Sequence, residues 1–226
     1  MREIIGIDGC PSGWILAYFR ESHIIFEVIK SLEELNKKKN ELYIGIDIPV
    51  NLQIKHQRVA DKEARKLLKN RASTIFSAPS IRALKAPTYR EACEINFKFT
   101  GKKISKQSWN LFSKIKDVQL AKERKPSLHF FFEVHPELSF MALNKMCLVD
   151  ISKKKELGKK IRLDLINSIY PFFNFNDVRK KFKLKDVADD DILDVIAILW
   201  STKRIVDNIA QAVPENSKDN NLKIFF

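Results

Sequence analysis

The tetrapeptide Ile-Gly-Ile-Asp occurs twice in this chain, ending at Asp8 and again at Asp47. Each copy closes an apolar run that is typical of a buried strand and places its aspartate where the strand gives way to a turn. Side chains alternate along a strand, so each aspartate shares a face with the glycine two residues before it, Gly6 or Gly45. We therefore expect open space beneath each carboxylate. If the strands are neighbours, both carboxylates meet at one sheet edge and need a cation between them.

The hydrophobic pattern predicts an α/β protein with strands over residues 3–8, 14–19, 24–29, 42–48 and 128–134. The first three strands follow one another through tight turns, whereas a mostly helical stretch separates the fourth from the fifth. A long helix, apolar nearly all round, is predicted over residues 189–212, and a final edge strand over residues 222–226. This order is that of the ribonuclease H fold, a mixed sheet flanked by helices. The same core underlies actin-like sugar kinases, so the fold alone does not select a chemistry.

Positive charge is concentrated in one segment. Residues 53–125 hold 19 of the 41 lysines and arginines but only 6 of the 28 acidic residues, and so account for the whole net charge of +13. Because phosphate backbones are bound mainly through Lys and Arg, this segment favours contact with a polyanion, with a merely solubilising surface as the alternative. No linker surrounds it, so we predict a basic helical insertion within a single domain of residues 1–226. Lysines 153–155 are interpreted as the solvated side of a later helix.

Composition excludes several other classes. The first residues do not resemble a signal or transit peptide, and no stretch approaches the ~20 apolar residues of a membrane span. The three cysteines, Cys10, Cys93 and Cys147, lack the paired spacing of a disulfide framework or a zinc site. These features predict a reduced, cytoplasmic protein without a membrane partner.

Two further carboxylates lie on the predicted last helix. Asp191 and Asp194 are separated by three positions and project from one helix face. The acidic residues just before them suit the positive end of the helix dipole, but Asp194 interrupts an apolar stretch. Burying a lone carboxylate is costly, so we expect Asp194 to be paired, protonated or bound to a metal. A buried salt bridge to Arg71 or Arg82 is the structural alternative.

The fifth predicted strand adds Glu133, an acidic residue that follows three phenylalanines, and His135, which acts either as a general acid or base or as a hydrogen-bonding group at the strand end. The candidate catalytic and metal-binding residues are thus all acidic and come from three strands and one helix: Asp8, Asp47, Glu133, Asp191 and Asp194. Hard oxygen donors in that number suit Mg²⁺ or Mn²⁺ rather than zinc. Two such ions would support an in-line phosphodiester hydrolysis.

Longer motifs give the chain a resemblance to a known family, and they lie in residues 5–14, 46–49, 71–79, 105–110, 133–137 and 189–194. On these motifs the chain resembles, nearly end to end, domain-of-unknown-function family 429, whose members are described as predicted ribonuclease-H-like nucleases. The resemblance implies the same fold and a nuclease activity. The spacing of Asp191 and Asp194 is also similar to the last-helix pair of Holliday-junction resolvases, which would complete a metal site with Asp8.

Several family motifs fall within the basic insertion and carry the predicted substrate-binding residues, Arg71, Ser73, Lys106 and Gln107, to which we add His135. Arg71 and Lys106 are suited to phosphate oxygens, since the arginine guanidinium binds them in a bidentate manner. Ser73 and Gln107 are suited to orienting a substrate. Alternatively, these polar side chains satisfy the loop backbone while their apolar neighbours pack the insertion onto the core.

Three functions from different classes are consistent with the sequence. The first is a metal-dependent nuclease or related phosphodiesterase acting on nucleic acid. The second is an actin-like-fold phosphotransferase, or a hydrolase of a small phosphorylated metabolite, and the third is a non-catalytic nucleic-acid-binding protein, which gains nothing from an acidic pocket. Cys10 as a nucleophile is a minor alternative, because nearby carboxylates raise the pKa of a thiol. The sequence does not indicate whether the substrate is DNA or RNA, whether it is single-stranded or double-stranded, or what the oligomeric state of the protein is.

Overall fold

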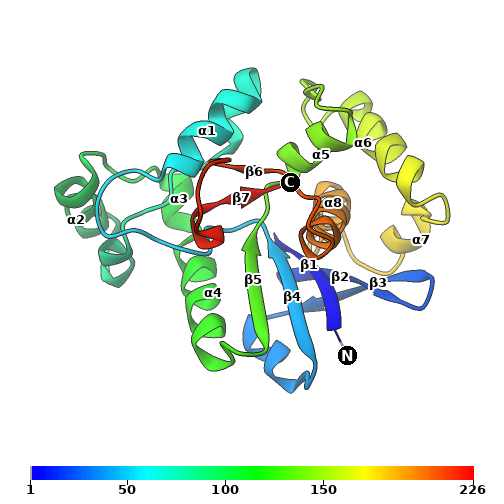
Figure 1. The fold of residues 1–226 in the computed structure, drawn as a ribbon, viewed down its shortest axis with the longest axis horizontal. Coiled ribbons are helices and arrows are strands. Elements are labelled where there is room, and N and C mark those ends of the chain that lie inside the picture. The colour runs from blue at the N-terminus through cyan, green and yellow to red at the C-terminus, as the bar shows by residue number, and fades with distance from the viewer. Residues whose placement is uncertain (1) are drawn as a thin grey trace.

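A mixed sheet of five strands lies at the centre of the protein (Figure 1). The computed structural model describes residues 2–226. The strands are β1 (Arg2–Cys10), β2 (Gly13–Arg20), β3 (His23–Ile29), β4 (Glu41–Ile46) and β5 (His129–Glu133), in the order β3-β2-β1-β4-β5. The first three strands pair antiparallel, whereas β4 runs parallel to both β1 and β5. The predicted α/β fold is confirmed, and the strand order is consistent with the ribonuclease-H-like arrangement.

The stretch between β4 and β5 is helical, as predicted. It contains α1 (Val59–Leu68), η2 (Lys69–Thr74), η3 (Ile81–Lys85), α2 (Tyr89–Thr100), α3 (Lys106–Asn110) and α4 (Phe112–Arg124). A short helix η1 (Leu32–Lys37) precedes β4, and α5 (Pro136–Leu143), α6 (Glu156–Ile169), α7 (Phe175–Arg179) and α8 (Asp189–Val206) follow β5. No helix of residues 2–226 is long and apolar enough to cross a bilayer.

The secondary structure of the C-terminal part of the chain differs from the prediction. Helix α8 ends at Val206 because Asn208 adopts a left-handed conformation, with φ of 57°, that cannot continue a helix. The predicted final edge strand does not join the central sheet as a ladder. Instead β7 (Ile224–Phe225) pairs antiparallel with β6 (Ala212–Val213), and a helical turn η4 (Asn220–Leu222) lies between them. A single bridge between Val134 and Phe225 connects this small sheet to the end of β5.

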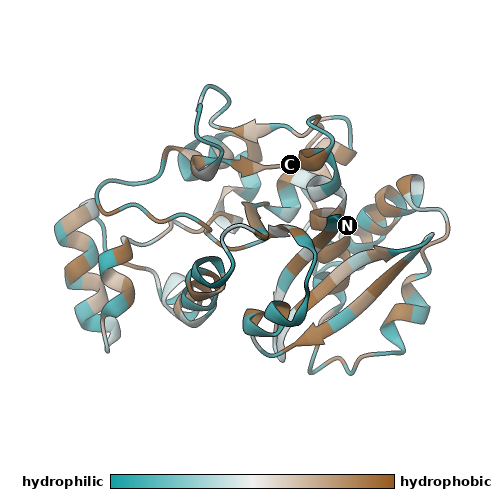
Figure 2. Ribbon diagram, turned by 60° about the horizontal axis from the view of Figure 1, so that its bottom comes forward, coloured by the Kyte–Doolittle hydropathy of each residue, from teal (hydrophilic) through white to brown (hydrophobic). Residues whose placement is uncertain are grey.

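The two faces of the central sheet are covered by different helices. On one face, Ile115 and Val118 of α4 belong to the same buried cluster as Ile7 and Ile46. On the other face, α8 packs with the buried side chains of β2, and α6 and α7 pack against α8 from outside. In Figure 2 the strands are largely coloured hydrophobic, whereas the surrounding helices carry both colours. The sheet is therefore the middle layer of three, with apolar residues on both faces.

The glycines of the repeated tetrapeptide make room for α8. A Cβ atom on Gly6 would lie 2.6 Å from the backbone of α8, and one on Gly45 would lie 1.9 Å from Thr202 Oγ1. The expectation of open space beneath the aspartates is therefore wrong, because the backbone of α8 fills the space at Gly6 and side chains, chiefly that of Thr202, fill it at Gly45. The close approach has a functional consequence, since it sets the first turns of α8 beside the ends of β1 and β4.

We expect Gly6→Ala to destabilise the fold by about 2 kcal/mol, because the added methyl group collides with backbone atoms that cannot rotate away. Urea denaturation of the two proteins measures the difference. Gly9→Ala is the matched control, since the nearest atoms to its added Cβ belong to the flexible Lys114 side chain, at 3.1 Å. Equal losses in the two variants would contradict the packing argument.

Candidate functional site

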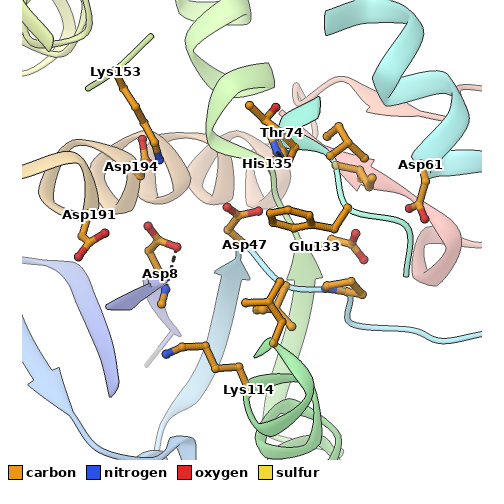
Figure 3. A pocket seen from close by; sticks show the side chains of 17 residues that line it. Asp8, Asp47, Asp61, Thr74, Lys114, Glu133, His135, Lys153, Asp191 and Asp194 are labelled. Atoms are coloured by element: carbon orange, nitrogen blue, oxygen red, sulfur yellow. Dashed lines mark hydrogen bonds and ion pairs between the residues drawn. The ribbon is translucent and has the colours of Figure 1, made fainter. Parts of the chain in front are cut away.

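Four aspartates face one cavity at the ends of β1 and β4. The cavity has a volume of about 210 Å³ and is lined by Asp8 at the end of β1, Asp47 just after β4, and Asp191 and Asp194 from the start of α8. Figure 3 shows these four side chains around a common space. The parallel register brings the strand pair together, because Ile7 is opposite Ile46 and the Asp47 N–H donates to the Ile7 carbonyl at 3.4 Å. Sequence elements far apart thus meet at one point.

Two of these carboxylates are buried and the other two, Asp47 and Asp191, are half-buried. Asp8 is 8% exposed and Asp194 is 1% exposed. Burial raises the pKa of Asp8 well above its ordinary range, and the three other aspartates raise it further. Burial likewise raises the pKa of Asp47 and of Asp194 to about 7, and that of Asp191 to about 6. The site therefore favours the uptake of protons or cations.

The repulsion between these carboxylates makes the stability of the metal-free protein depend on pH. Unfolded aspartates titrate near ~3.9, whereas the folded pKa values of Asp47 and Asp194 are about 7, so the folded state binds protons more tightly. The contribution to stability is greatest in acid and is lost as the pH rises toward the folded pKa. We expect the melting temperature of chelator-treated protein to fall between about pH 4 and about pH 7. Calorimetry measures the melting temperature, and an equal fall in a protein with both Asp47→Asn and Asp194→Asn would contradict this origin.

One cation reaches the aspartates. Lys153, from the loop between α5 and α6, donates a hydrogen bond from Nζ to Asp194 Oδ2, and its Nζ lies 3.5 Å from Asp190 Oδ2. The interpretation of Lys153 as a solvated side chain is therefore wrong, and neither predicted arginine pairs with Asp194. Asp191 has a different partner, since its Oδ2 accepts the Ala188 N–H at 2.8 Å at the start of α8. Asp8 Oδ1 accepts the Gly9 N–H at 2.7 Å.

Glu133 is separated from the aspartates by the register of β5. It pairs with Ile46, whose side chain lies in the core under α4, so Glu133 begins on the opposite sheet face from Asp47. Arg58 holds both of its carboxylate oxygens, at 2.5 Å and 2.7 Å, and the Val50 N–H donates to it at 3.0 Å. In Figure 3 Glu133 lies on the Asp61 side of the cavity. Glu133 thus forms a buried ion pair and leaves our set of candidate ligands.

A family profile described as "Protein of unknown function (DUF429)" matches residues 6–219. The chain belongs to this family. The match confirms the resemblance inferred from the motifs, while the family description assigns no activity. No curated protein and no solved structure matches the chain.

Most of the DUF429 motif residues predicted to bind substrate line a second cavity. Its volume is about 310 Å³, and it adjoins the first, since Asp47, Lys153 and Asp194 line both. The predicted residues along its wall are Arg71, Ser73, Gln107 and His135. Lys106 lies outside both cavities, because its Nζ is stacked 3.8 Å from the centre of the Tyr89 ring. The structure thus brings four of the five together.

Arg71 is anchored by a carboxylate that the sequence analysis did not assign. Its Nη2 donates to Glu137 Oε1 at 2.9 Å, and Arg162 donates to the other oxygen, Oε2, at 2.6 Å. Arg162 is fully buried, and its guanidinium also donates to the carbonyls of Ile151 and Gly158, both at 2.9 Å. Glu137 therefore connects the insertion of this DUF429 protein to α6 and fixes the direction of Arg71.

His135 lies between the two cavities. Its Nε2 is 3.4 Å from the Thr74 carbonyl oxygen, and its Nδ1 is buried and has no hydrogen-bond partner among the described residues. Burial lowers the pKa of His135, so the ring is neutral at physiological pH. In a neutral imidazole whose Nε2–H faces a carbonyl oxygen, the free Nδ1 is suited to accept a hydrogen bond from a molecule in either cavity.

Much of the basic charge of the insertion holds the fold together. Arg65 donates to the Ile75 carbonyl at 2.7 Å, Lys122 to the Val50 carbonyl at 3.0 Å, and Lys114 to the Gly13 carbonyl. These cations tie loops to the sheet and are not free for a polyanion. The exposed Lys102 and Lys103 line a third cavity of about 320 Å³ beside the second, where Ser73 and Gln107 also lie. Nucleic-acid binding therefore stays a prediction.

Cys10 is buried near Asp8, and burial raises the pKa of its thiol. Such a thiol forms little thiolate at neutral pH and is a poor nucleophile.

The donor chemistry of the aspartates fits a divalent ion of the Mg²⁺ or Mn²⁺ type, since all are hard carboxylate oxygens. Among residues 2–226, however, no three acidic, histidine or cysteine side chains are grouped closely enough to hold a metal as they stand. An ion would be bound by the side chains of Asp8, Asp47 and the α8 aspartates turning inward onto it. The site is a set of donors around a cavity rather than a preformed cage.

Proposed function

We propose that this DUF429 protein is a metal-dependent phosphodiester hydrolase whose centre is formed by Asp8, Asp47, Asp191 and Asp194. One observation carries the proposal. Four carboxylates, of which Asp8 and Asp194 are buried and Asp47 and Asp191 half-buried, face one cavity. Among residues 2–226, Lys153 alone makes an ion pair with any of them. Clustered like charge of this kind destabilises a fold unless a cation offsets it, and strongly raised pKa values in a cavity are typical of functional sites.

The aspartates would hold Mg²⁺ or Mn²⁺, which supplies a water of lowered pKa and stabilises negative charge on a phosphate. The residues of the second cavity would bind the substrate. Arg71 presents a guanidinium whose direction is fixed by Glu137, and Ser73 and Gln107 add neutral hydrogen-bonding groups. The free Nδ1 of His135 would hold or move a proton at the boundary between the two cavities.

The enclosure of the centre favours a second candidate, hydrolysis of a small phosphorylated metabolite. Thr74, Ile75 and Phe76 from the insertion and Ile224 from the C-terminal strand line the cavity together with the aspartates. Asp8 is left only 8% exposed. A small phosphate ester enters such a chamber more readily than a duplex, and the inward-facing lysines of the insertion reduce the charge available to a long polyanion.

A cleavage assay distinguishes these substrates. Labelled single-stranded and double-stranded DNA and RNA are incubated beside bis-(p-nitrophenyl) phosphate and nucleoside phosphates, with Mg²⁺, with Mn²⁺ or with chelator. Metal-dependent turnover of the polymers supports a nuclease, whereas turnover of the small esters alone supports the metabolite reaction. Turnover that persists with chelator contradicts a metal-dependent hydrolase.

A further inference from the structure

Lys153 lies at the centre of the charge pattern, although no motif pointed to it. Its ammonium donates to Asp194, which is 1% exposed, and lies 3.5 Å from the Asp190 carboxylate. The Lys153 side chain lines both the carboxylate cavity and the adjoining one. In Figure 3 it descends from above onto Asp194, on the side of the cavity away from Glu133. Asp194 is therefore already neutralised by a group of the protein itself.

The influence of Lys153 extends to the other aspartates. Its charge lowers the pKa of Asp8, Asp47 and Asp191 against the larger effect of burial. A second ammonium, that of Lys114, lines the same cavity from the opposite side, where it donates to the Gly13 carbonyl. Two lysines thus face the aspartates, and a single divalent ion would offset much of the negative charge that remains. A second ion would add positive charge beside an ammonium, which is unfavourable in a buried site.

We propose that Lys153 takes the place of a second metal ion. The centre then binds one divalent cation through Asp8, Asp47 and Asp191, while the Lys153 ammonium forms an ion pair with Asp194. This inference rests on the proposed function and replaces its expected pair of ions with one ion and one lysine. Lys153 acts as a positioning residue that fixes the side chain of Asp194 and the number of ions. Since it also borders the adjoining cavity, its charge faces a phosphate that enters from there.

Isothermal titration calorimetry with Mn²⁺ tests the stoichiometry without relying on activity. We expect one ion per chain for the wild type and two for Lys153→Met, whose Asp194 is freed to act as a ligand. Lys153→Arg keeps the charge and should bind one ion. Lys155→Met is the matched control, because it removes a nearby exposed lysine that lines neither cavity and makes no ion pair with the aspartates among residues 2–226, and it should also bind one.

The outcomes separate this inference from the proposed function. Two ions in the wild type, or one ion in a folded Lys153→Met protein, would overturn the role of Lys153 but leave the metal centre intact. No binding in any variant would overturn the metal centre itself.

Asp194→Asn provides an independent test that does not depend on the folding of Lys153→Met. If Asp194 is not a ligand, the Asn variant still binds one Mn²⁺ with an affinity close to that of the wild type. Asp8→Asn, by contrast, should weaken binding by about 100-fold or more, since even supporting residues outside the ligand set commonly contribute that much. Equal losses in the two variants would overturn the inference.

Discussion

Replacing Asp8 by Asn is expected to abolish metal-dependent turnover while making the metal-free protein more stable. The Asp8 carboxylate is repelled by the three other aspartates of the centre. The amide keeps the oxygen that accepts the Gly9 N–H but carries no charge. We expect turnover to fall by at least about 100-fold. The free energy of unfolding with chelator at alkaline pH should rise by about 1 kcal/mol, the size of gain that is common when a destabilising functional group is removed.

The opposite signs of the two effects make the prediction stringent. A residue that served only the fold would lose stability and activity together. The measurements are urea denaturation with chelator and initial rates with Mn²⁺. Asp164→Asn is the matched control, because Asp164 is an exposed member of an ion pair with Lys160 on α6 and should leave both quantities unchanged. A less stable Asp8→Asn protein would contradict the repulsion described above.

Replacing Glu133 by Ala is expected to lower the free energy of unfolding by about 4 kcal/mol, because it leaves a buried cation without its main partner. Arg58 is 7% exposed and would retain Asp61 as its only ion-pair partner among residues 2–226. Burial opposes the charge on Arg58, and the two carboxylates more than offset this and raise its pKa above the ordinary range. Chemical denaturation measures the loss, whereas Mn²⁺ affinity should be maintained.

The control for this prediction is Glu63→Ala on α1. Glu63 also pairs with a cation, Lys66 at 2.8 Å, but that pair is exposed to solvent and contributes little. If Glu133→Ala weakened Mn²⁺ binding as strongly as Asp8→Asn while leaving stability intact, Glu133 would return to the ligand set.

Local sequence patterns predicted the strands of the sheet and the convergence of the four aspartates, because these patterns extend over only a few residues. The repeated tetrapeptide ended both central strands, and the alternation of side chains put Asp8 and Asp47 on one face. The spacing of Asp191 and Asp194 likewise defined a helix face. The register between β4 and β5 is a long-range property, and a shift of one residue moves a side chain to the other face. For that reason the sequence did not predict that Glu133, although it lines the same cavity, pairs with Ile46 and is held by Arg58.

Contacts between distant loops were not predictable from the sequence. Lys153 belongs to a run of three lysines, a pattern that most often forms a solvated surface, and only the fold of the loop before α6 brings it to Asp194. The glycines beneath the aspartates were recognised as absent side chains, but the pattern cannot say whether a ligand or a helix fills the space. Glu137 lies within one of the family motifs, but its two arginine partners come from separate segments of the chain, which no local pattern connects.

The close approach of α8 to Gly6 and Gly45 divides the centre into two walls of unequal stiffness. One wall is made of β1, β4 and α8, with α8 packed against the backbone of β1 at Gly6 and through the Thr202 side chain against β4 at Gly45, and it allows little displacement. The other wall, which carries Lys153 and residues 74–76 of the insertion, consists of loop and short-helix segments held mainly by side-chain hydrogen bonds. Adaptation to ligands of different size will therefore be confined to the second wall, while the first acts as a fixed frame for the aspartates.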